Sequence, residues 1–369
     1  MGWNGTKIKT RLKELGITQE SIAKKMEISR VALNNWINGQ IPKGIHLIKL
    51  CKELHIGVDF FFEDSNIYEV SVPRHRTIRN IRVTDDMHKG AVELAMQYEK
   101  LFRNAPEPGM VPVLRVSNIN NMYALKLAEN LRELSGIQEN LPMSYKNTFL
   151  LLNKLGIVTI FKDFPPLLKT YAFYCCIHNY RVVFANYLIN VLDLIFPLLH
   201  ESVHAIFDDS RITTNEIYDD EMEKFCDNVA NYTQFPNGYV YTVMNELKEK
   251  SQALQIKILK EFSEKNHHSL FGLAKRLNQF DQVLPSRAIG GADTNLKRNF
   301  PTIGDVLFNS KDPFNFIKSL QELSPSFFNI IIDKLGYCTV RKFGEWLGLD
   351  NEMDAIEVKR AFEKYLKMM

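Results

Sequence analysis

Residues 194–207 read LIFPLLHESVHAIF, and this stretch decides how the rest of the chain is interpreted. It holds two histidines four residues apart, His200 and His204, with Glu201 directly after the first. Side chains four residues apart lie on the same face of a helix, so both imidazoles would reach one metal ion. The flanking apolar residues predict a buried helix, in which two unpartnered histidines are costly. The pattern therefore favours a metal site, and two core histidines bound to backbone carbonyls are the alternative.

A catalytic zinc ion usually has three protein ligands and leaves its fourth position to water. An acidic segment at 216–223 leads into an amphipathic run, Met222 to Phe235, which ends before Pro236. Glu223 and Asp227 are four residues apart in this run and would share a helix face. We expect Glu223 to be the third ligand and Asp227 to hold a ligand imidazole through its other ring nitrogen. The alternative is an acidic, solvated helix N-terminus stabilised by the helix dipole.

Together the two motifs resemble the ImmA/IrrE-type metalloproteases over roughly residues 120–240. The shared pattern is F-x-x-x-H-E-x-x-H from residue 196, E-x-x-C-D-x-V-A from residue 223, and then F-P. The chain departs from the family at 202–203, where leucine and glycine are usual, and at 226–227, where alanine and asparagine are usual. The resemblance implies a zincin-like fold, zinc ligation by His200, His204 and Glu223, and a general base, Glu201.

The same resemblance implies peptide hydrolysis. Zinc lowers the pKa of its water and polarises the scissile carbonyl, while Glu201 takes the proton and later returns it to the leaving amine. Tyr232, about two turns after Glu223, is a weak candidate for stabilising the oxyanion. Members of the family relieve repression by cleaving a partner repressor, often one with a helix-turn-helix fold. His178 at a predicted hairpin tip is a further candidate, although a turn histidine is the simpler interpretation.

A second pattern occupies the N-terminal segment. Thr18 and Ser29 each precede a short helical run and are expected N-caps. Five apolar residues can form one small core around a tight turn: Ile22, Ala23, Ile28, Leu33 and Trp36. The patterns T-Q-x-x-I-A from Thr18 and S-x-x-x-L-x-x-W-x-x-G from Ser29 resemble the Cro/CI-type (XRE) repressor domain over about residues 6–62. The resemblance implies a helix-turn-helix whose helix Arg30–Ile37 enters the major groove.

By this resemblance, five side chains of the segment would contact DNA. Gln19 would contact a phosphate or a base edge. Arg30, Val31 and Asn35 would contact bases, and Asn34 would contact a base or a phosphate. Arginine suits guanine and asparagine suits adenine. The first 62 residues hold ten Lys or Arg against five Asp or Glu, although the whole chain carries only +3. This basic excess lies where a polyanion would dock. The alternative is a helical module that binds protein instead.

Composition limits the protein class. A chain of 369 residues with 45% hydrophobic content is expected to form two or three domains. It has no charged-then-apolar leader and no long apolar run, so we expect neither secretion nor a membrane partner. The five cysteines are scattered and odd in number, which predicts a reduced, cytoplasmic protein without a disulfide framework.

Periodicity and turn residues predict the remaining elements. The arginine-containing segment 68–83 predicts an exposed strand or linker. Before the metal motif we expect helices Asp85–Phe102 (capped by Thr84), Asn121–Leu134 and Ser144–Leu155, a strand Ile157–Phe161, and a hairpin around His178 that includes the adjacent Cys175 and Cys176. After residue 240 we expect helices Glu246–Phe262, Leu270–Gln279, Ile303–Phe308, Pro313–Leu323 and Ala355–Lys367, and residues 338–349 resemble another small helix-turn-helix fragment.

The sequence thus predicts a mainly α, α+β protein in four segments. These are a helix-turn-helix bundle (1–65), a linker strand and helix (66–110), a zincin-like metallopeptidase with a small sheet (111–245), and a helical C-terminal region of unassigned role (246–369). We expect a DNA-binding regulator with zinc-dependent endopeptidase activity against a repressor, acting at operator DNA, with a homodimer possible. The alternative is a transcription regulator or antitoxin whose metal site is non-catalytic and whose helix-turn-helix docks on DNA or protein.

Overall fold

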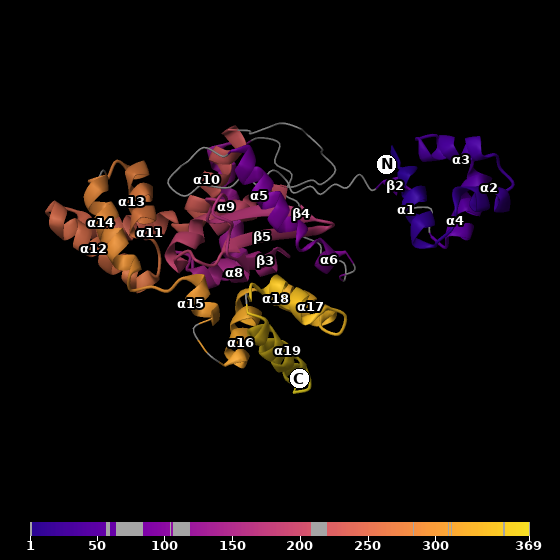
Figure 1. Ribbon diagram of the computed structural model, residues 1–369. Helices are drawn as coiled ribbons and strands as arrows, with labels where there is room; N and C mark the ends of the chain where they lie inside the picture. The colour runs from indigo at the N-terminus through magenta and orange to yellow at the C-terminus, as the bar shows by residue number, and fades with distance from the viewer. Residues whose placement is uncertain are drawn as a thin grey trace. The chain divides into compact units, whose positions relative to one another are not determined.

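The computed structural model describes residues 2–56, 60–63, 84–103, 105, 119–207, 220–282, 284–308, 310, 312–349 and 351–368 (Figure 1). The chain divides into two compact units, Met1–Tyr68 and Glu69–Met369. It is mainly helical, with a small three-stranded sheet in the second unit, as the sequence predicts. The expected basic linker at 68–83 and the acidic residues 216–219 lie outside the described residues. The further division of the second unit at residues 110 and 245 stays a prediction.

The first unit is a bundle of short helices with a small strand pair. Its described elements are β1 (Gly2–Trp3), α1 (Thr6–Glu14), α2 (Gln19–Lys25), α3 (Arg30–Ile37), α4 (Gly44–Leu54) and β2 (Phe62–Glu63), with β1 antiparallel to β2. The expected caps are confirmed. Thr18 Oγ1 accepts a hydrogen bond from the Ser21 N–H at 3.2 Å, and Ser29 Oγ accepts one from the Ala32 N–H at 3.1 Å. Each cap satisfies a backbone donor that has no partner within its helix, which fixes where α2 and α3 begin.

The apolar residues of this unit form a separate small core. Four of the five residues predicted for it are buried, and Ile28 is half-buried against it. A close approach of α1 to α3 completes the packing, because a Cβ on Gly5 would lie 1.9 Å from the Trp36 carbonyl oxygen. Only glycine allows this approach. The same carbonyl accepts a hydrogen bond from Trp3 Nε1 at 2.7 Å, which ties the N-terminal strand to the end of α3.

The second unit is built around a three-stranded sheet that packs against long helices. Its strands are β3 (Val158–Lys162), β4 (Ala172–Ile177) and β5 (Tyr180–Asn186). Its helices are α5 (Asp85–Met96), α6 (Glu99–Phe102), α7 (Asn121–Ser135), α8 (Tyr145–Lys154), α9 (Val191–Phe207), α10 (Asp220–Gln234), α11 (Asn237–Leu247), α12 (Gln252–Asn266), α13 (Leu270–Leu277), α14 (Ser286–Lys297), α15 (Ile303–Phe308), α16 (Pro313–Leu323), α17 (Pro325–Lys334), α18 (Val340–Leu347) and α19 (Glu352–Leu366).

The strand order is β3-β5-β4, so β4 lies at an edge of the sheet. β4 and β5 form the expected antiparallel hairpin, and β3 runs parallel to β5. His178 forms the turn of the hairpin with a left-handed φ of 53°. Cys175 and Cys176 are adjacent on β4 and therefore point to opposite faces.

Helices cover both faces of this sheet. Phe149 of α8 contacts Phe161 of β3, with ring centroids 5.4 Å apart. Tyr98, between α5 and α6, contacts Phe184 of β5 at 5.3 Å. Phe161 pairs with Ala185 in the parallel ladder, so Phe161 and Phe184 point to opposite faces. α9 packs against β4 and β5, and α10 packs against α9 and α7. The two helices that carry the predicted metal ligands are therefore neighbours in the core of the unit.

Two predicted helices are wrong in extent. The expected helix 85–102 begins at its Thr84 cap but divides into α5 and α6. Tyr98 lies at the break, is fully buried, and donates its hydroxyl to the Trp346 carbonyl at 3.1 Å. The expected helix 246–262 is also wrong, because α11 ends at Leu247 and α12 begins at Gln252. No glycine or proline marks that break in the sequence.

A segment of the C-terminal region is tied to the start of α9. Residues 301–304 exchange backbone hydrogen bonds with 187–191, including Val191 N to the Pro301 carbonyl at 3.0 Å and Gly304 N to the Tyr187 carbonyl at 2.7 Å. The side-chain amide of Asn190 donates to the carbonyls of residues 297 and 300, at 3.0 and 2.8 Å. The start of α9, the helix that carries both histidines, is thus held in place by residues about a hundred positions later in the sequence.

The end of α18 repeats the geometry of the end of α2. A threonine caps the first helix of each pair, Thr18 in α2 and Thr339 in α18. At the same spacing after the threonine, the backbone enters the left-handed region, at Glu27 with φ 56° and at Gly348 with φ 70°. Other helices of the chain end in the same way, for example at Gly16, His55 and Gly156. The resemblance of residues 338–349 to a helix-turn-helix fragment therefore stays a prediction.

The close contact inside each turn is also the same. The N–H of Ile28 returns to the Ala23 carbonyl at 3.0 Å, and the N–H of Leu349 returns to the Gly344 carbonyl at 2.9 Å. The residue that supplies this carbonyl is small in both turns, Ala23 in one and Gly344 in the other, and this allows the next helix to approach. A Cβ on Gly344 would lie 2.9 Å from the Cβ of Ala355 in α19.

Candidate metal centre

The two metal motifs lie on two packed helices. α9 presents His200 and His204, which are 2% and 8% exposed, and α10 presents Glu223, whose side chain is 19% exposed. Pro197 lies inside α9, one turn before His200. α10 begins within the acidic run, where negative side chains favour a helix N-terminus. Buried imidazoles and a half-buried carboxylate are thereby brought to one point between the helices.

The three predicted ligand side chains converge. The Nε2 atoms of His200 and His204 are 3.1 Å apart. Glu223 places one carboxylate oxygen 3.3 Å from His200 Nε2 and the other 3.2 Å from His204 Nε2. Tetrahedral zinc with bonds of about 2.0–2.2 Å would hold its ligand atoms roughly 3.3–3.6 Å apart. The two-nitrogen, one-carboxylate set and its spacing therefore fit a zinc ion with one position left open.

Two residues of α10 contact the outer nitrogens of the imidazoles. Asp227 Oδ1 lies 3.0 Å from His200 Nδ1, in the position expected from the sequence. Cys226 Sγ lies 3.8 Å from His204 Nδ1, a contact that the sequence interpretation missed. The spacing contained the signal, because residues three and four positions after Glu223 lie on the same helix face. One face of α10 thus offers a metal ligand and a contact to each imidazole.

Glu201 is buried at 1% exposure on the sheet side of α9. Its Oε2 accepts a hydrogen bond from the backbone N–H of Tyr174 at 2.9 Å. Tyr174 lies on β4, the edge strand of the sheet. The backbone of β4 therefore orients the Glu201 carboxylate. As an edge strand, β4 is also where an added peptide strand would pair with the sheet.

The charges of this cluster support one another. Burial lowers the pKa of His200, but hydrogen bonds to Asp227 and Glu223 and the charge of Glu201 outweigh it and raise the pKa to about 10. Burial raises the pKa of Glu223, but hydrogen bonds to both imidazoles outweigh it and hold that pKa below its usual range. Three carboxylates beside two imidazoles demand a positive counter-charge. A divalent cation would supply that charge.

Two weaker candidates have other partners. The Tyr232 hydroxyl donates to Asn121 Oδ1 at 2.5 Å, and the Arg276 guanidinium lies over its ring at 4.5 Å. Tyr232 is therefore held by a structural contact between α10 and α7. His178 Nε2 lies 3.3 Å from Glu99 Oε1, so this turn histidine is accounted for by a contact with α6.

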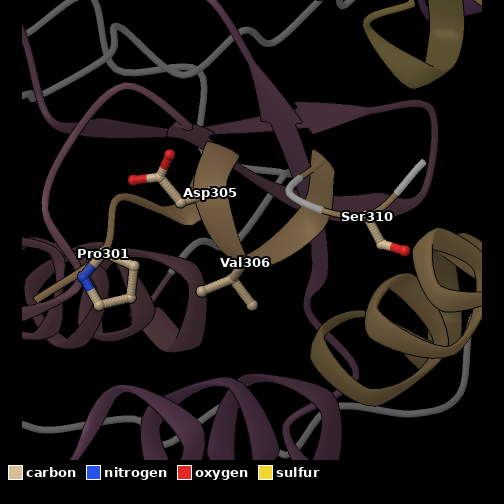
Figure 2. A pocket seen from close by; sticks show the side chains of 4 residues that line it. All are labelled: Pro301, Asp305, Val306 and Ser310. Atoms are coloured by element: carbon tan, nitrogen blue, oxygen red, sulfur yellow. The ribbon is translucent and has the colours of Figure 1, made fainter. Parts of the chain in front are cut away.

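A surface pocket lies elsewhere in the second unit. Pro301, Asp305, Val306 and Ser310 line it around α15 (Figure 2). Its carboxylate is already used, because Asp305 Oδ2 accepts hydrogen bonds from the N–H and hydroxyl of Thr302, both at 2.8 Å. None of the four residues belongs to the histidine cluster, so this pocket adds no group to the metal centre.

Four of the five residues predicted to contact DNA lie on α3, and the fifth lies at the start of α2. Arg30, Val31, Asn34 and Asn35 are exposed on α3, and Gln19 is half-buried at the start of α2. Val31 is 68% exposed, so its side chain is accessible on the surface of this helix. α3 has no acidic residue in its first turn, so phosphate oxygens would meet no like charge there.

A family model described as Helix-turn-helix matches residues 8–61 of the chain. This match covers the first unit and supports the XRE-type interpretation of α1 to α4. No curated protein and no solved structure matches the chain. Among the described residues, no helix is long and apolar enough to span a bilayer.

Proposed function

We propose that this protein is a DNA-binding regulator whose second unit is a zinc-dependent endopeptidase. The observation that carries the enzymatic half is the convergence of His200, His204 and Glu223 with Glu201 at the same turn of α9. A structural zinc site is closed by four protein ligands, whereas a catalytic one has three and a nearby base. In the described part of the chain, three side chains of the cluster are suited to bind the metal, and Glu201 is suited to be the base.

Bound zinc would lower the pKa of a water molecule and polarise a scissile carbonyl. The chain's own residues would do the rest of the chemistry. Glu201 takes the proton from the attacking water and returns it to the leaving amine. The hydrogen bond that its Oε2 accepts from the Tyr174 N–H orients the carboxylate for this proton transfer. Asp227 orients the His200 ring through Nδ1, so that Nε2 is directed to the cation.

The position of β4 supports an extended peptide as substrate. An edge strand offers backbone groups that a peptide can pair with, and β4 is an edge strand beside α9. Tyr174 lies on this strand and contacts Glu201, so a peptide added along β4 would pass close to the base. We propose that the substrate is a partner repressor with a helix-turn-helix fold, as the resemblance to ImmA/IrrE-type proteases implies.

The N-terminal half of the proposal rests on the surface of α3. Its exposed Arg30, Val31 and Asn35 would read base edges in the major groove, and Asn34 a base or a phosphate. Gln19 at the start of α2 would contact a phosphate or a base edge. The local basic excess would add affinity independent of sequence. Helix-turn-helix proteins commonly bind two half-sites as dimers, and we propose the same for this chain.

The metal is tested first, with purified full-length protein. Zinc content and affinity are measured for the wild type, His204→Ala, Glu223→Gln and a control, Glu221→Gln, which changes an exposed carboxylate of the same helix. We expect about one zinc per chain, at least tenfold weaker binding for the two ligand variants, and an unchanged control. Full zinc affinity in both ligand variants would refute the metal site.

The chemistry is tested separately with Glu201→Gln. This variant should keep its zinc and its fold, because Glu201 is not a ligand, and should lose about 10²–10⁴-fold in the rate of repressor cleavage. The substrate is a co-encoded repressor incubated with each variant and followed by mass spectrometry. If zinc binds but neither wild type nor variant cleaves, the non-catalytic alternative, a regulator or antitoxin whose metal stabilises the fold, replaces the protease.

A further inference from the structure

One face of α10 meets both histidines of the candidate centre. Glu223, Cys226 and Asp227 occupy positions i, i+3 and i+4 and therefore point the same way. Glu223 contacts the Nε2 atoms of both rings, Asp227 contacts Nδ1 of His200, and Cys226 contacts Nδ1 of His204. The consecutive residues Cys226 and Asp227 thus each contact the Nδ1 atom of one imidazole.

The chemistry of a neutral imidazole gives these contacts a role. When Nε2 binds a cation, Nδ1 carries the ring proton and needs an acceptor. Asp227 offers His200 a carboxylate, which is a strong acceptor. Cys226 offers His204 a sulfur, which is a weak one. The separation of 3.8 Å is within the range of a hydrogen bond to sulfur and too long for one to oxygen.

We propose that Cys226 is a positioning residue for the metal centre. It holds the His204 ring with its Nδ1 proton toward sulfur and Nε2 toward the cation. The two histidines are then unequal: His200 is firmly supported and His204 is the more weakly supported ligand. This inference rests on the proposed zinc site.

Burial alone does not account for Cys226. A fully buried cysteine often serves as a small apolar side chain, and its replacement by alanine then affects packing only. Cys226 is fully buried, but its sulfur faces a ring nitrogen of a candidate ligand. Cys175 provides the matched comparison, because it is equally buried and lies on β4, which supplies no candidate ligand.

The test compares full-length wild type, Cys226→Ala, Cys226→Ser and Cys175→Ala. Zinc affinity is measured by competition with a chromophoric chelator, and the cobalt(II)-substituted proteins are compared by visible spectroscopy. We expect Cys226→Ala to bind zinc 10- to 100-fold more weakly, the usual effect of removing an outer partner of a ligand histidine. Cys226→Ser, which keeps an acceptor, should recover part of the loss, and Cys175→Ala should match the wild type.

A second readout separates positioning from packing. In zinc-loaded protein, the ¹⁵N shifts of the His204 ring should report a proton on Nδ1 in the wild type and an altered Nδ1 signal in Cys226→Ala, while the His200 signals stay unchanged. Wild-type zinc affinity and an unchanged His204 spectrum in Cys226→Ala would overturn this inference and leave the zinc site intact. A wild-type chain that binds no zinc would overturn both.

Discussion

The two helix pairs α2–α3 and α18–α19 have similar first-helix ends and different surfaces. Both have a threonine cap, a left-handed residue and a return hydrogen bond at the same spacing. Their second helices begin differently. α3 begins with Arg30 and has no acid in its first turn, whereas α19 begins with Glu352 and also carries Asp354 there. The turn is a way to pack two successive helices, and the exposed side chains determine whether it suits DNA.

The surroundings of the two motifs differ as well. In the first unit the motif belongs to a small core of its own. α18 instead joins the large core of the second unit, where Trp346 and Leu347 are buried and the Trp346 carbonyl accepts the Tyr98 hydroxyl. Lys162 Nζ also donates to the Glu345 carbonyl, at 3.1 Å, near the end of the helix. The C-terminal motif is therefore part of a scaffold, and the following substitutions test this contrast.

The largest expected difference between the two helix pairs is in their effect on operator binding. Arg30→Ala should weaken operator binding by about 1–3 kcal/mol and relax the preference at one base position. Glu352→Ala, at the corresponding first position of α19, should leave operator affinity unchanged. Binding is measured by fluorescence anisotropy on genomic fragments at moderate salt. Equal losses in the two variants would mean that both motifs contact DNA, and the contrast would fail.

The next difference concerns packing. Gly344→Ala should destabilise the second unit by about 1–3 kcal/mol, because its Cβ would lie 2.9 Å from the Cβ of Ala355. α2 already has an alanine, Ala23, at the matching position. Its replacement by glycine should cost the first unit about 1 kcal/mol through helix propensity. Scanning calorimetry of the full chain measures both. An unchanged second-unit transition in Gly344→Ala would show that α18 and α19 are less closely packed.

The smallest difference concerns the left-handed residue. Gly348→Ala should cost about 1–2 kcal/mol, because an L-residue with a side chain is strained at φ 70°. Glu27 already bears that strain at φ 56°, so Glu27→Gly should stabilise the first unit by up to about 1 kcal/mol. Urea unfolding of each variant checks the opposite signs. Effects of the same sign would show that the two turns are not equivalent.

The local features of the first unit could be predicted from sequence. Its caps depend on side chains and backbone donors only three residues apart, so Thr18 and Ser29 identify the helix starts directly. The exposed reading face also follows from helical periodicity. The strand pair of Gly2–Trp3 with Phe62–Glu63 was not predicted, because it joins two very short segments far apart in sequence.

The metal cluster was predictable to the extent that it depends on helical spacing. His200 and His204 share a face of one helix, and Glu223 and Asp227 share a face of another, so two spacings predict the four side chains. That the two faces meet depends on the packing of α9 against α10, which sequence spacing does not contain. The contact of Cys226 with His204 was missed for the same reason.

The tie between residues 301–304 and the start of α9 has a consequence for cooperativity. Val191 and Asn190 bond to backbone at residues 297–301, which follow α10 to α13 in the chain. Lys297 reaches back to Asp193 of α9 at 2.6 Å. Opening of residues 297–304 would therefore release the first turn of the histidine helix. Amide protons in the middle of α9 and in α14 are therefore expected to exchange with solvent in the same rare opening event, as one foldon that spans most of the second unit.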